Sequence, residues 1–301
     1  MKLVRLRAPQ VKSKISYHFF ALTCVSGWSV AYVFTRLALV HFSVYSLGFL
    51  RYAVASVVLA ALMPVLKIRP PAPRDLWKFA ASGATGFFLY MITFNKGAAI
   101  ETSATSSIII ATAPVITAML SGAVYKEKLK IFQWIAIVVE FAGLLILTLW
   151  DGVMSVGRGI PWLLSAALSV SVFNMQQRHL IKSYTGLQAS IFSIFAGTLM
   201  LSVFTPAAIG ELMTASPKYL FYLALLGIVP SALSYVTWSI AIERAQGVSK
   251  ISNYMFVTPV LASVLGFFIA SERPDLGTII GGGTILFGIF IFNGGFQSKR
   301  N

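Results

Sequence analysis

Charged residues are scarce in this chain of 301 residues: they make up 11% of it, and only nine are acidic. Hydrophobic residues make up 57%, which is more than a soluble domain of this length can bury. A single cysteine, Cys24, excludes a disulfide framework and a thiolate metal site. The three histidines are scattered, and no HExxH, GxSxG or Walker-type motif is present. We therefore expect no enzyme, no metal and no cofactor.

The chain instead has ten long apolar segments. A membrane-spanning helix needs about 20 mostly apolar residues, and eight of the ten segments contain no Asp, Glu, Lys or Arg. The two exceptions carry Arg51 and Glu140. We predict an all-α integral membrane protein with ten transmembrane helices. They lie at 17–35, 42–66, 79–95, 102–125, 131–150, 159–177, 183–210, 219–242, 251–271 and 276–296.

The net charge of +15 is explained by membrane topology. With the N-terminus in the cytoplasm, 18 of the 24 Lys and Arg residues fall on the cytoplasmic side, five fall outside, and Arg51 lies within a segment. This is the positive-inside distribution, and it puts both termini in the cytoplasm. We expect the lipid bilayer, and no nucleic acid, as the partner of these charges. The first segment has no convincing cleavage site after it and is interpreted as an uncleaved helix.

The rare residues of the second half repeat those of the first half, 145 positions further on. The pairs are Tyr90/Tyr235, Pro114/Pro259, Glu127/Glu272 and Gly143/Gly288. Each copy holds five segments, and a copy that begins after an odd number of crossings must be inverted. We predict two inverted five-helix repeats, residues 1–151 and 152–301. Inverted repeats are typical of alternating-access transporters, whose substrate site lies between the halves near the bilayer midplane.

These stretches resemble the EamA branch of the drug/metabolite transporter superfamily. The resemblance rests on residues 28–39, 104–129, 141–147, 248–274 and 286–292, and on the Arg51-Tyr52 pair. It implies a bacterial inner-membrane carrier of ten helices, often an exporter of amino acids and related metabolites. It also implies a cavity lined mainly by the first, third, fourth, sixth, eighth and ninth helices, with the fifth and tenth at the edge.

Polar and aromatic residues gather on the segments that the resemblance places around the cavity. Rings can hold the apolar part of a small solute while amides and hydroxyls orient its polar ends. The candidate substrate-binding residues are Trp28, Tyr32, Tyr90, Asn95, Asn174, Gln177, Tyr235, Trp238 and Asn253. Tryptophan and tyrosine also form interfacial belts, and amides also link helices, so each residue has a structural alternative.

Four further residues in the segments have more than one interpretation each. Pro114 and Pro259 should kink equivalent helices, which suggests gating, although membrane helices also tolerate proline. Arg51 could reach an interface, bond to carbonyls or bind an anionic group; because matching family members carry an arginine here, we favour a structural anchor. Glu140 is a candidate for proton coupling or a hydrogen-bonded structural acid.

The sequence therefore predicts a secondary transporter that exports small neutral or zwitterionic metabolites, with amino acids first. The alternatives are an exchanger of phosphorylated metabolites or nucleotide sugars, and a drug exporter, on the same fold. A phosphate-binding cavity would need several Lys or Arg, and the segments offer one. A GxxxG pattern at Gly277 and Gly281 is explained by a contact within the chain or by a dimer, so we expect a monomer or a weak homodimer.

Overall fold

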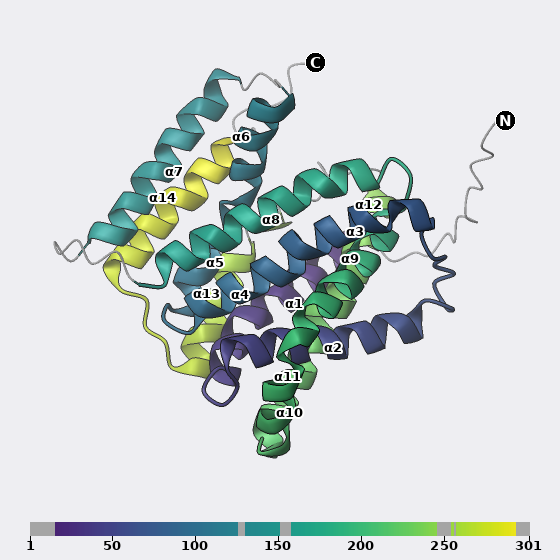
Figure 1. The fold of residues 1–301 in the computed structure, drawn as a ribbon. Coiled ribbons are helices and arrows are strands. Elements are labelled where there is room, and N and C mark those ends of the chain that lie inside the picture. The colour runs from purple at the N-terminus through teal and green to yellow at the C-terminus, as the bar shows by residue number, and fades with distance from the viewer. Residues whose placement is uncertain (1–15, 126–129, 151–157, 246–253, 256, 293–301) are drawn as a thin grey trace.

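The computed structural model describes residues 16–125, 130–150, 158–245, 254–255 and 257–292 (Figure 1). These residues contain helices and no strand, which confirms the all-α prediction. The α-helices of the first half are α1 (Tyr17–Ala38), α2 (Val44–Leu62), α3 (Leu76–Gly83), α4 (Tyr90–Ala98), α5 (Ser103–Ala111), α6 (Ala113–Tyr125) and α7 (Ile131–Leu149). Those of the second half are α8 (Ile160–Leu180), α9 (Gly186–Leu201), α10 (Thr205–Met213), α11 (Pro217–Ile228), α12 (Ser234–Ala245), α13 (Val257–Ala270) and α14 (Leu276–Phe292).

Short helical pieces join several of these helices into longer spans. Two are π-helical, η2 (Ala84–Leu89) between α3 and α4 and η4 (Val229–Leu233) between α11 and α12; two are 3-10 turns, η1 (Pro73–Asp75) and η3 (Ser202–Phe204). With these pieces, each of the ten predicted segments contains a helix. Within the described residues, five spans are long and apolar enough to cross a membrane, and Ile131–Ile146 of α7, α13 and α14 are shorter apolar helices.

The two π-helical pieces begin 145 positions apart, at the same offset as the paired residues of the sequence. Short π-helical turns inside α-helices are often found at functional sites. In the first repeat, Gly86 of η2 packs so closely on the ring of Phe173 that a Cβ atom would lie 2.2 Å from it. In the second repeat, η4 carries Ser231, which is fully buried. The sequence repeat is therefore accompanied by a repeat of backbone geometry.

Helices α7 and α14 lie side by side at one edge of the molecule (Figure 1). Their contacts are related by the repeat: a Cβ on Gly143 would lie 2.8 Å from the carbonyl oxygen of Gly281, and one on Gly288 would lie 3.0 Å from that of Ala136. Glycine is required where backbones approach this closely. A contact within the chain therefore explains the GxxxG pattern, because Gly277 likewise packs on Trp150.

The fourth predicted span is broken where the sequence places Pro114. α5 ends at Ala111 and α6 begins at Ala113, with Thr112 in a turn whose N–H bonds to the carbonyl of Ile109 at 3.1 Å. Proline cannot donate a backbone hydrogen bond and clashes with the preceding turn, which accounts for the break. In the second repeat, Pro259 lies in the first turn of α13, where proline is tolerated.

The first helix of each repeat donates a side-chain hydrogen bond to the other repeat. Ser29 of α1 donates to the carbonyl of Thr258 at 3.2 Å, and Ser171 of α8 donates to the carbonyl of Ala113 at 2.8 Å. Both serines are fully buried, and each accepting carbonyl belongs to the residue before a paired proline. The two repeats therefore interlock at the helices that carry the prolines.

Candidate functional site

An aromatic cluster lies where α1 meets α12. The ring of Trp28 lies 6.0 Å from that of Tyr235 and 5.4 Å from that of Trp238, measured between centroids. All three side chains are half-buried. A close approach of the helices brings them together, since a Cβ on Gly27 would clash with the Ser234 hydroxyl oxygen of α12. These three predicted residues thus form one surface between the repeats.

A second group of rings continues from this surface towards α2 and α4. Phe87 of η2 connects the two groups, because its ring lies 5.8 Å from Tyr235 and 5.2 Å from Tyr52. On the α4 side, the Phe94 ring stacks on Tyr90 at 5.5 Å and meets the edge of Tyr32 at 5.6 Å. Such edge-on and offset contacts are favourable for aromatic rings.

Arg51 of α2 lies next to these rings and is only 5% exposed. Its Nε donates to the Ser231 hydroxyl of η4 at 2.6 Å, and its Nη1 donates to the Thr35 hydroxyl of α1 at 3.3 Å. The guanidinium carbon also lies 5.8 Å from the centre of the Tyr52 ring. Arg51 therefore joins the first repeat to the π-helical piece of the second.

Four tyrosines belong to one packed core, and the Arg51 guanidinium lies beside the ring of one of them, Tyr52. They are Tyr32, Tyr52, Tyr90 and Tyr235. None of their hydroxyls makes a hydrogen bond within the part of the chain that the structure describes. We define the Arg51–tyrosine cluster as these four tyrosines and Arg51. It takes residues from both repeats, as a substrate site of an inverted-repeat transporter should.

The predicted amides that the structure describes lie outside this cluster. Asn95 is fully buried, and its Nδ2 donates to the carbonyl of Val44 at 2.9 Å, so it links α4 to the start of α2. Asn174 is exposed and lies 3.4 Å from the Thr117 hydroxyl. Gln177 donates to two serine hydroxyls on α3 and α9, which gives it the role of a helix link in this conformation. Asn253 lies outside the described residues.

Tyr52 and Phe87 were not among the predicted site residues. Tyr52 has a signal in the sequence, because it directly follows the membrane arginine, Arg51. Phe87 has none, since it is one of 23 phenylalanines in an apolar chain. Only the structure shows its place, because the Phe87 ring of η2 contacts the rings of Tyr52 and Tyr235.

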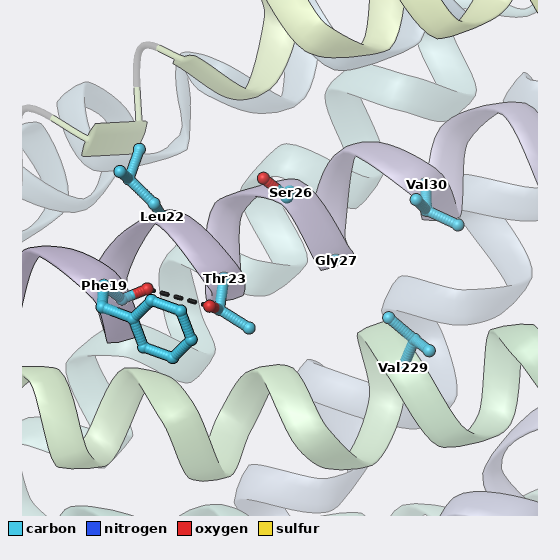
Figure 2. Close-up of a pocket in the computed structure, with 7 residues that line it drawn as sticks. All are labelled: Phe19, Leu22, Thr23, Ser26, Gly27, Val30 and Val229. Atoms are coloured by element: carbon cyan, nitrogen blue, oxygen red, sulfur yellow. Dashed lines mark hydrogen bonds between the residues drawn. The ribbon is translucent and has the colours of Figure 1, made fainter. Parts of the chain in front are cut away.

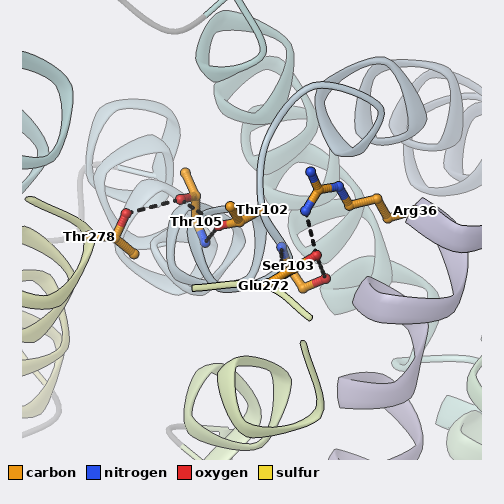
Figure 3. A network of polar contacts seen from close by, with 6 residues as sticks. All are labelled: Arg36, Thr102, Ser103, Thr105, Glu272 and Thr278. Carbon is orange, nitrogen blue, oxygen red and sulfur yellow. Dashed lines mark hydrogen bonds and ion pairs between the residues drawn. The ribbon is translucent and has the colours of Figure 1, made fainter. Parts of the chain in front are cut away.

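A charged network joins the repeats at the helix ends that the topology prediction places outside (Figure 3). Glu272, which follows α13, accepts hydrogen bonds from Arg36 Nη1 at 2.6 Å and from the Ser103 N–H and hydroxyl, both at 2.9 Å. Nearby, Glu101 accepts from the Gly159 N–H at 3.1 Å, and burial raises the pKa of this carboxyl. We call the Arg36–Glu272–Ser103 contact the latch; Glu127, the repeat partner of Glu272, lies outside the described residues.

A shallow groove on α1 is a poorer candidate for a solute site (Figure 2). It runs along Phe19, Leu22, Gly27 and Val30 and ends at Val229 of η4. The Thr23 hydroxyl in the groove already donates a hydrogen bond to the carbonyl of Phe19 at 2.9 Å. The groove therefore offers a solute mainly apolar surface and no charge.

Glu140 lies on α7, against Gly288 of α14. It is 6% exposed, and its Oε1 has no hydrogen-bond partner among the described residues. In the other half of this helix pair, Ile285 takes the equivalent place against Gly143. The acid thus lies in an edge pair of helices and not in the Arg51–tyrosine cluster.

Interlocked repeats, apolar spans and a polar cluster between the halves define a multi-pass membrane protein of the transporter class. The chain belongs to the EamA-like transporter family, which matches residues 15–149 and 157–294. The two matches confirm the ten-helix, two-repeat fold class. They also confirm the family resemblance seen in the sequence.

Relatives of this chain are described as transporters. A "probable terminal-alkyne amino-acid exporter" of Streptantibioticus cattleyicolor is 30% identical over 281 residues, covering 93% of this chain and 94% of the relative. The "uncharacterized transporter YdfC" of Bacillus subtilis is 28% identical and covers 85% and 83%. An "S-adenosylmethionine uptake transporter" of Rickettsia prowazekii is 24% identical and covers 64% of each. A solved crystal structure shares the fold, with a TM-score of 0.60 at 17% identity, over 95% of this chain and 99% of the other.

Proposed function

We propose that this protein is a secondary exporter of amino acids that works by alternating access in a bacterial inner membrane, with both termini in the cytoplasm. The observation that supports it most is the Arg51–tyrosine cluster, which both repeats build. The similarity to an exporter of an unusual amino acid supports the solute class.

The rings and the polar groups of the site would bind different parts of the solute. Trp28, Tyr235 and Trp238 present aromatic surface to the apolar side chain of the solute. The tyrosine hydroxyls and Arg51 supply polar contacts for its charged end. A solute bound there touches both repeats, so its binding energy can depend on how the repeats are arranged. A ligand shifts a conformational equilibrium only through such a difference in affinity.

Alternating access requires that one side of the site is closed while the other opens. The latch joins the repeats at the predicted outer ends of α1, α5 and α13. We infer that it closes the outer side in this conformation. Pro114 provides a weak point in the fourth span, because α5 and α6 are broken there. Pro259, in the first turn of α13, marks the equivalent place in the second repeat.

If protons drive the export, Glu140 is our candidate for the coupling acid. It is a buried carboxyl without a partner for Oε1 among the described residues. A charge in the hydrocarbon region is expensive, so a carboxyl there has reason to take up and release a proton as its surroundings change.

Counterflow in proteoliposomes tests the proposed function. Labelled L-leucine, L-phenylalanine and L-propargylglycine should each be screened against the same unlabelled solute. We expect flux for at least one of them, and we expect Tyr235→Ala and Trp238→Ala to lower that flux about fivefold or more, because each removes a ring at the site. Trp134→Ala, on the exposed face of α7, is the matched control and should leave flux unchanged.

Two results would count against the proposal. Absence of counterflow for every amino acid in the screen would reject the solute class. Unchanged flux in both ring variants, at normal expression and monodispersity, would remove α12 from the site.

A further inference from the structure

Arg51 is a buried cation for which the described residues supply no anion. Its two hydrogen-bond partners, Ser231 and Thr35, are neutral hydroxyls. Its third nitrogen, Nη2, makes no hydrogen bond to a described residue. A guanidinium is always charged and carries five N–H donors. Within a membrane protein such a group normally pairs with an acid or with carbonyl oxygens.

Arg36 shows how this chain pairs an arginine in a structural contact. Its Nη1 lies 2.6 Å from the Glu272 carboxylate. The Arg36 side chain is 35% exposed, so its charge would cost less free energy without a partner than a buried charge would. The more deeply buried Arg51 lacks such a partner among the described residues. A purely structural role therefore leaves the charge of Arg51 uncompensated.

The tyrosines around Arg51 are also incompletely bonded. The hydroxyls of Tyr32, Tyr52, Tyr90 and Tyr235 have no hydrogen-bond partner among the described residues. In that part of the chain, the buried side-chain atoms that lack both a partner and accessible surface belong to Asn95, Ser106 and Glu140. The four hydroxyls and Nη2 of Arg51 are therefore not among the fully enclosed atoms. They are donors that belong to one packed core beside a single positive charge, which is the composition of an anion site.

We propose that Arg51 binds the carboxylate of the transported solute, with tyrosine hydroxyls of the cluster as further donors. The proposal rests on the proposed function and narrows it to solutes that carry one carboxylate. A carboxylate matches the planar guanidinium and supplies the missing anion. A phosphorylated solute would need more cations than the single arginine of this cluster. The apolar end of the solute then faces the rings of Trp28, Tyr235 and Trp238.

Ligands that differ only in the carboxylate test the proposal on the wild-type protein. L-phenylalanine is compared with L-phenylalaninamide and phenethylamine, and L-leucine with L-leucinamide and isoamylamine, as competitors of counterflow. We expect each acid to compete about 10- to 100-fold more strongly than its amide or amine, as for the loss of a hydrogen bond to a charged group. Equal competition within the pairs would overturn the carboxylate role.

Substitutions at Arg51 then locate the effect. Arg51→Gln should abolish the preference for the acid over the amide, and Arg51→Lys should retain part of it because the charge remains. Tyr90→Phe should weaken the acids and leave the amines unchanged. A preserved acid preference in Arg51→Gln would refute the assignment. Should Arg51→Gln fail to fold, as judged by size-exclusion chromatography, the comparison of Arg51→Lys with wild type decides, and an unchanged preference there overturns the proposal.

The same data separate this proposal from the proposed function. Flux or competition by the amines alone would leave a transporter of amphipathic solutes and reject Arg51 as a carboxylate site. Competition by no member of either pair, against a labelled amino acid that does show counterflow, would reject Arg51 as a carboxylate site, whereas the proposed function is rejected only when every amino acid of the screen lacks counterflow.

Discussion

The latch makes the strongest mechanical prediction, because Glu272→Ala removes a contact between the repeats. Glu272 accepts two hydrogen bonds from Ser103 and one from Arg36, all at 2.9 Å or less. A hydrogen bond to a charged group contributes about 1.5–3 kcal/mol. If the loss of the Ser103 contact on opening costs as much as one such bond, Glu272→Ala shifts the equilibrium towards the outward-open state by about 10- to 150-fold.

Labelling of a single cysteine measures this shift. In a Cys24→Ala background, Ser107→Cys is placed one turn below Ser103 on α5, where it is 1% exposed. A membrane-impermeant thiol reagent added outside should label it at least about tenfold faster when Glu272→Ala is also present, because the outward-open state is then populated more.

The matched control is Asp275→Ala. Asp275 caps α14 by accepting from the Thr278 N–H at 2.6 Å, a contact within the second repeat only. Its loss should leave the labelling rate unchanged. Equal labelling rates with and without Glu272→Ala would refute the idea that the latch holds the outer side closed.

Two further predictions concern acids on different elements. Glu140→Gln should remove the pH dependence of uptake if Glu140 is the coupling acid; a preserved dependence on pH would exclude it. Hydrogen bonds from Lys78 and Tyr184 lower the pKa of the Asp75 carboxyl below its ordinary value. Asp75 therefore stabilises the fold above about pH 4, and this contribution is lost as pH falls through the lowered pKa. The difference in apparent melting temperature between wild type and Asp75→Asn should shrink from pH 7 to pH 3; a constant difference would contradict this.

The sequence predicted the architecture because rare residues mark it. Proline, glutamate and glycine are unusual inside apolar helices, so their recurrence after 145 positions carries information that leucine or alanine cannot. Gly143 and Gly288 illustrate this: each lies where two backbones meet, and there is no room for a side chain. The family match to both halves agrees with the repeat that these residues indicated.

The site was harder to predict because the helices are apolar on every face. A helix that is apolar all round gives no periodic signal of how it is rotated about its axis. Asn95 and Tyr90 lie on the same short helix, yet Asn95 bonds to the carbonyl of Val44 while the Tyr90 ring stacks on that of Phe94. Composition could place both residues in α4, but only packing determines which of them joins the cluster of rings.

The interlocking of the repeats determines which helices can move together. α1 packs against α12 and α13, and α8 packs against α4, α5 and α6. The first helix of each repeat is therefore held mainly by the opposite repeat, including the helix that carries its proline. The bonds Ser29 to Thr258 and Ser171 to Ala113 join these groups at fully buried positions. In the proposed alternating access, a rocking motion would carry α1 with α13 and α8 with α6. The Arg36–Glu272 pair lies within the first of these groups, so the contact of Glu272 with Ser103 on α5 is the part of the latch that would have to break.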